Sequence, residues 1–186
     1  MKKNRILKII LIAITGTVVP ILLLVILSMI LYGKNFPLVK FHYWKGFIEQ
    51  RNGNLDSAIK SYDKVTELDA EYPTAYISRG SAYLDLKQYD KAIDNYTIAI
   101  KLSPENEESY AYRGRAFYEI DKVENSKDDF DKAIDLNKDF SYAYSNRAIL
   151  KYTKLNDVAG GCEDLKKAAE LGDEDSKAHL KANVCE

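Results

Sequence analysis

The chain has 186 residues, 46% hydrophobic and 30% charged, which suits one ordinary domain with a small accessory segment and excludes two full domains. Five of the 27 Lys and Arg residues lie within residues 1–34, where there is no acid, so the rest of the chain holds 22 basic and 28 acidic residues. This acidic excess argues against a nucleic-acid-binding surface, which needs clustered basic residues.

The first predicted element is an apolar helix. Residues 9–32 carry no charge, and a helix of these 24 residues would be roughly 36 Å long, enough to cross the ~30 Å hydrocarbon core of a bilayer. A cleaved signal peptide fits poorly, because its apolar part is about 7 to 15 residues long and ends at a small-residue cleavage site. We therefore expect a basic cytoplasmic flank at residues 1–8, a transmembrane signal-anchor at residues 9–32 and a linker at residues 33–38.

The flanking charges predict the orientation of this span. Four basic residues within residues 1–8 favour a cytoplasmic N-terminus with the rest of the chain outside the cytoplasm, against the competing bias of Lys34, Lys40 and Lys45. Aromatic residues follow the linker, and two interpretations of them stay open. They either sit at the level of the lipid headgroups or belong to the first helix of the next domain: Phe41, Tyr43 and Trp44.

Beyond the linker, small residues recur every 34 positions, at Gly46, Gly80, Gly114 and Ala148. A second set follows the first three of them at offsets of 12, 16 and 19: Ala58, Tyr62 and Val65, then Ala92, Tyr96 and Ala99, then Ser126, Phe130 and Ala133. Offsets that differ by four and three residues lie on one face of a helix. Each repeat is therefore predicted to be a helical hairpin.

This pattern resembles the tetratricopeptide repeat (TPR) family from about Val39 to Gly172. The family's alternation of small and large residues is clearest at Tyr76, Gly80, Tyr83, Ala92, Tyr96, Ala99 and Pro104, and continues at Tyr110 and Tyr144. The resemblance implies an all-α solenoid of about four hairpins, residues 39–72, 73–106, 107–140 and 141–172, with a capping helix at 173–186. His42 and Glu49 depart from the pattern, and the last unit shifts by one residue, at Gly161, Leu165 and Ala168.

The resemblance also implies a function. In the family, the first helix of each unit lines a concave groove that holds a partner's peptide or helix. The inward positions of this chain include Tyr43, Trp44, Phe47, Ser78, Ser81, Tyr112, Arg115, Tyr118, Tyr142, Asn146 and Tyr152. We therefore predict a membrane-tethered scaffold for protein–protein interaction. The alternative is an assembly subunit that associates with itself or packs into a membrane complex.

One subclass of the family grips the C-terminal carboxylate of chaperone tails with Lys, Asn and Arg. The corresponding positions here hold Tyr43 or Ile77, Phe47 or Ser81, and Glu108 or Tyr142, so this clamp is not expected.

Enzyme chemistry is not expected either. The two histidines, His42 and His179, are more than a hundred residues apart and have no nucleophile or metal-ligand partner at a useful spacing. We predict no catalytic residue, no metal site and no cofactor.

Two cysteines lie near the C-terminus, Cys162 at the start of the last unit's second helix and Cys185 at the end of the capping helix. If these helices run antiparallel, the two residues return to the same level and a disulfide is geometrically feasible. Such a bond persists only in an oxidising compartment. Two unpaired, buried thiols are the alternative that the sequence leaves open.

Overall fold

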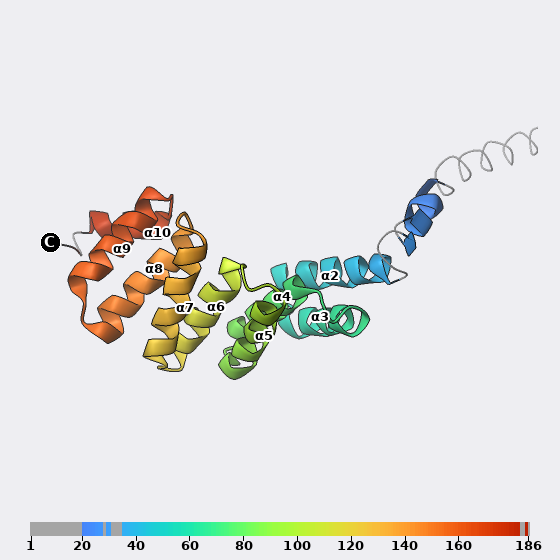
Figure 1. Cartoon of the computed structure of the whole chain (residues 1–186), viewed down its shortest axis with the longest axis horizontal. Helices are drawn as coiled ribbons and strands as arrows, with labels where there is room; N and C mark the ends of the chain where they lie inside the picture. Colours follow the sequence, from blue (N-terminus) through green and yellow to red (C-terminus); the bar gives the residue numbers. More distant parts are fainter. Residues whose placement is uncertain (1–19, 28, 31–34, 183–184, 186) are drawn as a thin grey trace, which may run out of the picture.

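The computed structural model describes residues 20–27, 29–30, 35–182 and 185 (Figure 1). Residues 36–181 form a row of helices in which each packs on its neighbours in the chain. No strand occurs in the described part, so the predicted all-α solenoid of helical hairpins is confirmed. The helices are α2 (Phe36–Arg51), α3 (Leu55–Leu68), α4 (Pro73–Asp85), α5 (Tyr89–Leu102), α6 (Glu107–Glu119), α7 (Val123–Leu136), α8 (Ser141–Leu150), the π-helix η1 (Lys151–Leu155), α9 (Val158–Glu170) and α10 (Glu174–Lys181).

The predicted membrane span at residues 9–32 lies mostly outside the described residues. Within it, residues 20–27 and 29–30 are helical, and their large apolar side chains are exposed. No helix within the described ranges is both long enough and apolar enough to span a bilayer.

The turns inside the hairpins repeat with the same period as the sequence. Gly53, Lys87 and Asp121 each follow the end of a first helix and adopt positive φ angles of 79°, 58° and 57°. This left-handed conformation reverses the chain so that the second helix can pack back on the first. Pro73 lies in the first turn of α4, where proline costs no helical hydrogen bond.

The last hairpin contains one residue more than the others. Its left-handed residue is Asn156, with φ of 53°, which is 35 residues after Asp121. The π-helix η1 absorbs this extra residue, because a π turn closes over five residues where an α turn closes over four. The inserted residue explains why the sequence pattern of the last unit is shifted by one.

Each of the first three hairpins pairs a glycine with an aromatic ring. A Cβ atom on Gly80 would lie 2.8 Å from Cε1 of Tyr96, and the same approach occurs between Gly46 and Tyr62. In the third hairpin the ring is that of Phe130, and all three rings are fully buried. Glycine therefore lets the two helices approach closely around a ring that fills the remaining space.

An arginine recurs in the first helix of the last three hairpins and ties successive hairpins together. Arg113 donates two hydrogen bonds to the Asp129 carboxylate at 2.8 Å and one to Thr97 Oγ1 at 3.1 Å. Thr97 lies on α5 of the preceding hairpin, whereas Asp129 lies on α7 of the same hairpin. Arg79 and Arg147 make the equivalent contacts, to Asn95 and Asp63 and to Asp164 and Asp131.

The C-terminal end of the row is closed by α10, which packs on α9. The Asp173 side chain accepts a hydrogen bond from the backbone N–H of Ser176 and so caps α10. Cys162 on α9 and Cys185 beyond α10 form a disulfide, with their Cα atoms 5.6 Å apart. The Tyr152 hydroxyl lies 2.8 Å from the Cys162 sulfur and 3.1 Å from that of Cys185.

Candidate functional site

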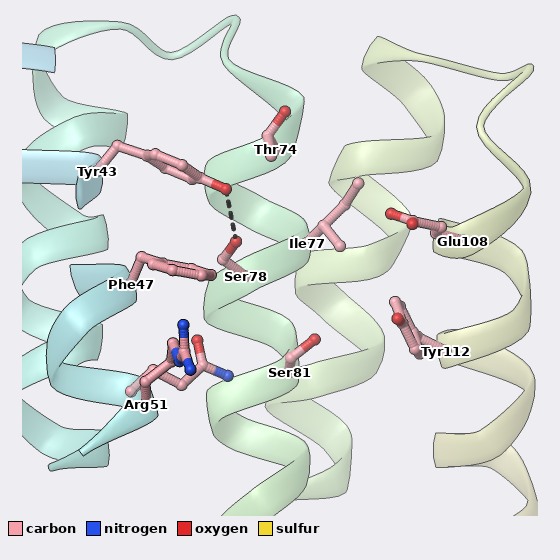
Figure 2. A pocket seen from close by; sticks show the side chains of 10 residues that line it. Tyr43, Phe47, Arg51, Thr74, Ile77, Ser78, Ser81, Glu108 and Tyr112 are labelled. Atoms are coloured by element: carbon pink, nitrogen blue, oxygen red, sulfur yellow. Dashed lines mark hydrogen bonds between the residues drawn. The ribbon is translucent and has the colours of Figure 1, made fainter. Parts of the chain in front are cut away.

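The face formed by the first helices of the hairpins contains two neighbouring cavities. The N-terminal cavity has a volume of about 330 Å³ and lies between α2, α4 and α6 (Figure 2). Its side chains come from three successive hairpins, so a ligand here would contact all three. They are Tyr43, Phe47, Gln50, Arg51, Thr74, Ile77, Ser78, Ser81, Glu108 and Tyr112.

The N-terminal cavity combines apolar walls with a few polar groups. The Tyr43 and Ser78 hydroxyls face each other across the gap between α2 and α4, 3.5 Å apart (Figure 2). Phe47 projects toward α4 beneath this pair, and the Arg51 guanidinium lies 5.9 Å from its ring centroid. Glu108 approaches from α6 on the opposite side (Figure 2). The cavity therefore offers a cation on one side and an anion on the other.

The C-terminal cavity is larger, about 500 Å³, and lies between α6, α8, η1, α9 and α10. Arg115 donates to the Asn146 side-chain oxygen at 3.1 Å and pairs with Glu119 at 2.6 Å, which holds the guanidinium at the rim. The lining residues are Arg115, Tyr142, Ser145, Asn146, Ile149, Tyr152, Thr153, Leu165, Asp173, Asp175, Ser176 and His179. The wall formed by α10 and its N-cap, with Asp173, Asp175, Ser176 and His179, is thus the most polar side of this cavity.

Packed aromatic rings lie at the boundary between the two cavities. The Tyr112 and Tyr142 ring centroids are 5.1 Å apart, and these rings also contact Tyr96 and Phe140 at 5.9 Å. Burial raises the pKa of Tyr142 to about 12 and also raises the pKa of Tyr112. Both side chains therefore support the fold as well as the surface of the groove.

The predicted groove residues divide into three groups. Five of them line the N-terminal cavity, namely Tyr43, Phe47, Ser78, Ser81 and Tyr112. Four line the C-terminal cavity, namely Arg115, Tyr142, Asn146 and Tyr152. Trp44 and Tyr118 line neither: Trp44 is exposed beside Phe41 and Ile48, and the Tyr118 hydroxyl lies 3.1 Å from that of Thr153.

Several lining residues were missing from the prediction although the repeat register could have found them. The inward positions of the frame include the second, fifth, sixth, ninth and twelfth residues of units that begin at residues 39, 73, 107 and 141. Six further lining residues occupy such positions: Gln50, Thr74, Ile77, Glu108, Ser145 and Ile149. In contrast, Arg51 and the residues of α10 are outside that frame. Only the packing of α10 against α9 brings Asp173, Asp175 and His179 to the cavity.

The two cavities are lined by hydroxyls, amides, aromatic rings and a few charged groups. Among the residues that the structure describes, no three His, Cys, Asp or Glu side chains are grouped to hold a metal ion.

Comparison with known proteins identifies the repeat. The family model described as TPR repeat matches residues 48–87 and 80–121. No curated protein matches the chain. TPR repeats are thus present in the central part of the chain.

Solved structures share the fold. A MamA fragment from Desulfovibrio magneticus RS-1 is 19% identical, with a TM-score of 0.64 over 77% of this chain and 88% of that one. An Arabidopsis OM64 TPR domain is 22% identical, with a TM-score of 0.62 over 63% and 98%. The first TPR of Spaghetti (RPAP3), bound to the HSP90 peptide SRMEEVD, is 25% identical, with a TM-score of 0.60 over 61% and 90%.

Proposed function

We propose that this chain is a membrane-tethered scaffold, and not an enzyme, that binds a peptide or helix of another protein in the groove formed by its two cavities. The observation that carries the proposal is the position of both cavities on the face formed by the first helices, where they meet at Tyr112 and Tyr142. An extended segment that crosses this boundary would contact the lining of both cavities.

The lining side chains favour a particular kind of ligand. Phe47 and Ile77 offer apolar contact, Ser78 and Ser81 offer hydroxyls, and Arg51 offers a cation. A segment with a large apolar side chain next to an acidic residue complements this arrangement. The acidic wall of the C-terminal cavity, with Asp173 and Asp175, favours a basic residue further along the same segment.

One of the similar solved structures is bound to an HSP90 peptide, so a peptide with a free C-terminal carboxylate is a ligand to consider. In this chain the positions that would grip it hold Tyr43 or Ile77, Phe47 or Ser81, and Glu108 or Tyr142, which supply no Lys or Arg. Our proposal is therefore an internal segment and not a free C-terminus.

The membrane part of the proposal rests on the sequence. Residues 9–32 are uncharged and long enough to span a bilayer, and the basic residues before them favour a cytoplasmic N-terminus. The Cys162–Cys185 disulfide agrees with repeats that face an oxidising space outside the cytoplasm.

The binding site can be tested with peptides selected from a random display library by the full chain in lipid nanodiscs. Phe47→Ala with Arg51→Ala removes an apolar contact and the cation from the N-terminal cavity. This change should lower the affinity for the selected peptides by about tenfold or more. Tyr112 and Tyr142 are unsuitable for this test, because their removal would also disturb packing.

A matched control is Ile98→Ala with Lys101→Ala on α5. Ile98 is 37% exposed, as is Phe47, but lines neither cavity. This variant should bind like the unaltered chain, and C-terminal amidation of the peptides should not change their affinity. If the Phe47 and Arg51 variant binds the peptides as tightly as the unaltered chain, the groove is not the binding site. If binding depends strongly on a free C-terminal carboxylate, the ligand is not an internal segment.

A further inference from the structure

The outward surface of α2 carries a row of exposed apolar side chains. Leu38, Phe41, Trp44 and Ile48 are 50%, 61%, 56% and 55% exposed. Their spacing of three, three and four residues places them on one side of the helix, over a length of about 15 Å. We call this surface the α2 end face.

Comparison between the hairpins shows what this surface is. Phe41 and Ile48 occupy the third and tenth positions of the 34-residue frame. In the later hairpins these two positions are fully buried, and in the second hairpin Ala75 packs against Val65 of the preceding second helix. The equivalent residues are Ala75, Ala82, Ser109, Ala116, Ala143 and Leu150.

The α2 end face is thus the contact surface for an earlier hairpin, yet no earlier hairpin exists among the described residues. The terminal units of repeat arrays usually present a polar surface at this place. Here the side chains are the large apolar ones of Phe41 and Ile48, whereas the later hairpins have Ala or Ser at these positions except for Leu150. Exposed apolar rows of this kind mark surfaces that are covered in the working molecule.

Basic groups lie beside the α2 end face on its α3 side, and one of them, Lys64, pairs with Glu67 at 2.5 Å. Lys45 lies beside Phe41 and Trp44 in a shallow hollow, and a second hollow joins Lys45 to Lys60, Lys64 and His42. The one acid shared by these two hollows, Glu49, accepts a hydrogen bond from Asn54 at 2.9 Å. This basic rim contrasts with the acidic excess of the chain after residue 34.

We propose that the α2 end face lies on the surface of a membrane that contains anionic lipids, with its apolar side chains among the acyl chains and its lysines at the headgroups. The inference rests on the proposed tether at residues 9–32. An apolar stripe with aromatic rings and a basic rim is the composition of helices that lie in the bilayer interface.

The position of the face in the chain supports this occupant. Only three residues separate Phe36, the first residue of α2, from the end of the predicted span at residue 32, so this connection reaches at most roughly 14 Å. The N-terminal end of α2 is therefore held close to the lipid. A second copy of the chain is a weaker candidate, because face-to-face pairing would bring two sets of Lys45 and Lys60 together.

The chain contains its own probe for this proposal. Trp44 is the single tryptophan, so its fluorescence reports on the α2 end face alone. The full chain would be reconstituted into vesicles of phosphatidylcholine and phosphatidylglycerol, with and without lipids brominated near the headgroup end of the acyl chain. We expect blue-shifted emission that is quenched by the brominated lipid and protected from acrylamide.

Two variants sharpen the test. Lys45→Glu with Lys60→Glu should abolish most of the bromolipid quenching in vesicles with phosphatidylglycerol, since the rim would then repel the headgroups. Trp44→Phe with Ile98→Trp moves the probe to α5, on the second helix of the next hairpin. That probe should stay open to acrylamide and insensitive to brominated lipid.

The outcomes separate the tether from the docking. Loss of the protein from the vesicles in an alkaline wash would overturn the tether and the docking with it. Retention in the vesicles with Trp44 open to acrylamide would overturn only the docking. Blue-shifted emission without bromolipid quenching, varying with the protein-to-lipid ratio, would assign the face to a second copy and equally overturn it.

Discussion

At the scale of single residues, the fold depends on a match of sizes between the two helices of each hairpin. Gly80 and Tyr96 illustrate it, because the ring is fully buried and has no room to move away from an added methyl group. In the last hairpin the frame position is Ala148, and the close approach is instead that of Gly161 to Tyr152 on η1. In every hairpin a glycine thus lies against an aromatic ring, although in the last hairpin the two residues occupy different positions of the repeat.

Gly80→Ala should lower the free energy of unfolding by about 1 kcal/mol. The new Cβ would meet Tyr96 at 2.8 Å, and overpacking of this kind costs about 1 to 3 kcal/mol. The higher helix propensity of alanine offsets up to about 1 kcal/mol of that cost. Urea unfolding followed by circular dichroism measures the difference. In a Tyr96→Leu background the same change should become neutral or stabilising, and an equal loss there would contradict the steric explanation.

A second residue-scale prediction concerns the buried ion pair of Arg113 and Asp129. Arg113→Met leaves the carboxylate without its partner, which should cost about 3 kcal/mol at neutral pH. Adding Asp129→Asn should recover much of this loss, since Asn95 already fills the equivalent place in the second hairpin. Chemical unfolding of the three variants measures both effects. No recovery in the double variant would show that Arg113 acts mainly through other contacts.

This pair also predicts a pH dependence. Burial raises the pKa of Asp129, and the hydrogen bonds and charge of Arg113 oppose that rise. The folded chain therefore holds this proton more tightly than the unfolded chain, and the associated stability is lost as pH rises through the folded pKa. Removing Arg113 raises the pKa of Asp129 further. The loss of unfolding free energy caused by Arg113→Met should therefore become smaller as pH falls. A deficit that grows toward acidic pH would contradict this.

At the scale of elements, the last hairpin differs from the others because of one inserted residue. The π-helix η1 takes up this residue, after which α9 regains its packing on α8 with Asp164 as the partner of Arg147. The last hairpin therefore packs in the same way as the others despite the inserted residue, which appears in the sequence as a shift of the pattern by one position. The same hairpin carries the disulfide that holds the chain beyond α10.

Reduction of that disulfide should release α10. The bond closes a loop with a sequence separation of 23, worth up to about 3 kcal/mol of chain entropy in the unfolded ensemble. Because α10 packs mainly on α9, its amides should exchange with solvent much faster after reduction, whereas those of α4 to α7 should change little. Hydrogen-exchange mass spectrometry of residues 174–181 measures this.

The variant with Cys162→Ser and Cys185→Ser is the control for reduction. It should resemble the reduced chain and show no further response to reductant. Unchanged protection of α10 in this variant would mean that packing on α9 alone secures the helix.

At the scale of the whole molecule, packing gathers many of the fourteen tyrosines into the interior and the groove. Burial raises the pKa of Tyr62 and Tyr142 to about 12, and raises the pKa of Tyr96 as well. The folded chain therefore favours the neutral form of these three tyrosine side chains. Their contribution to stability is therefore complete below pH 10 and is lost as pH rises toward 12.

An alkaline titration should therefore show two stages. Exposed tyrosines should ionise first without loss of helicity, and the buried ones should ionise near pH 12 together with unfolding. Tyrosinate absorbance and circular dichroism, recorded on the same samples, measure the two events. Tyr142→Phe should shift unfolding to higher pH. Ionisation of all tyrosines in one early stage, with the helices intact, would contradict the burial described here.

Much of the fold could be predicted from the sequence. The 34-residue period, the hairpins and the alternation of small and large residues depend on spacing and side-chain size within short segments, which the order of residues displays directly. The inward positions of the groove followed from the same register. Ile77 and Glu108 were within reach of that register, although the prediction omitted them.

The sequence by itself thus determined the repeat, the helices and an apolar segment long enough for a membrane. Only the tertiary structure decided which side chains meet: that Trp44 belongs to the α2 end face, that α10 walls a cavity, and that Arg113 bridges three helices. The physical reason is that periodicity is a local property of the chain. Cavities, ion pairs and exposed faces depend on distances between residues far apart in sequence, which only packing sets.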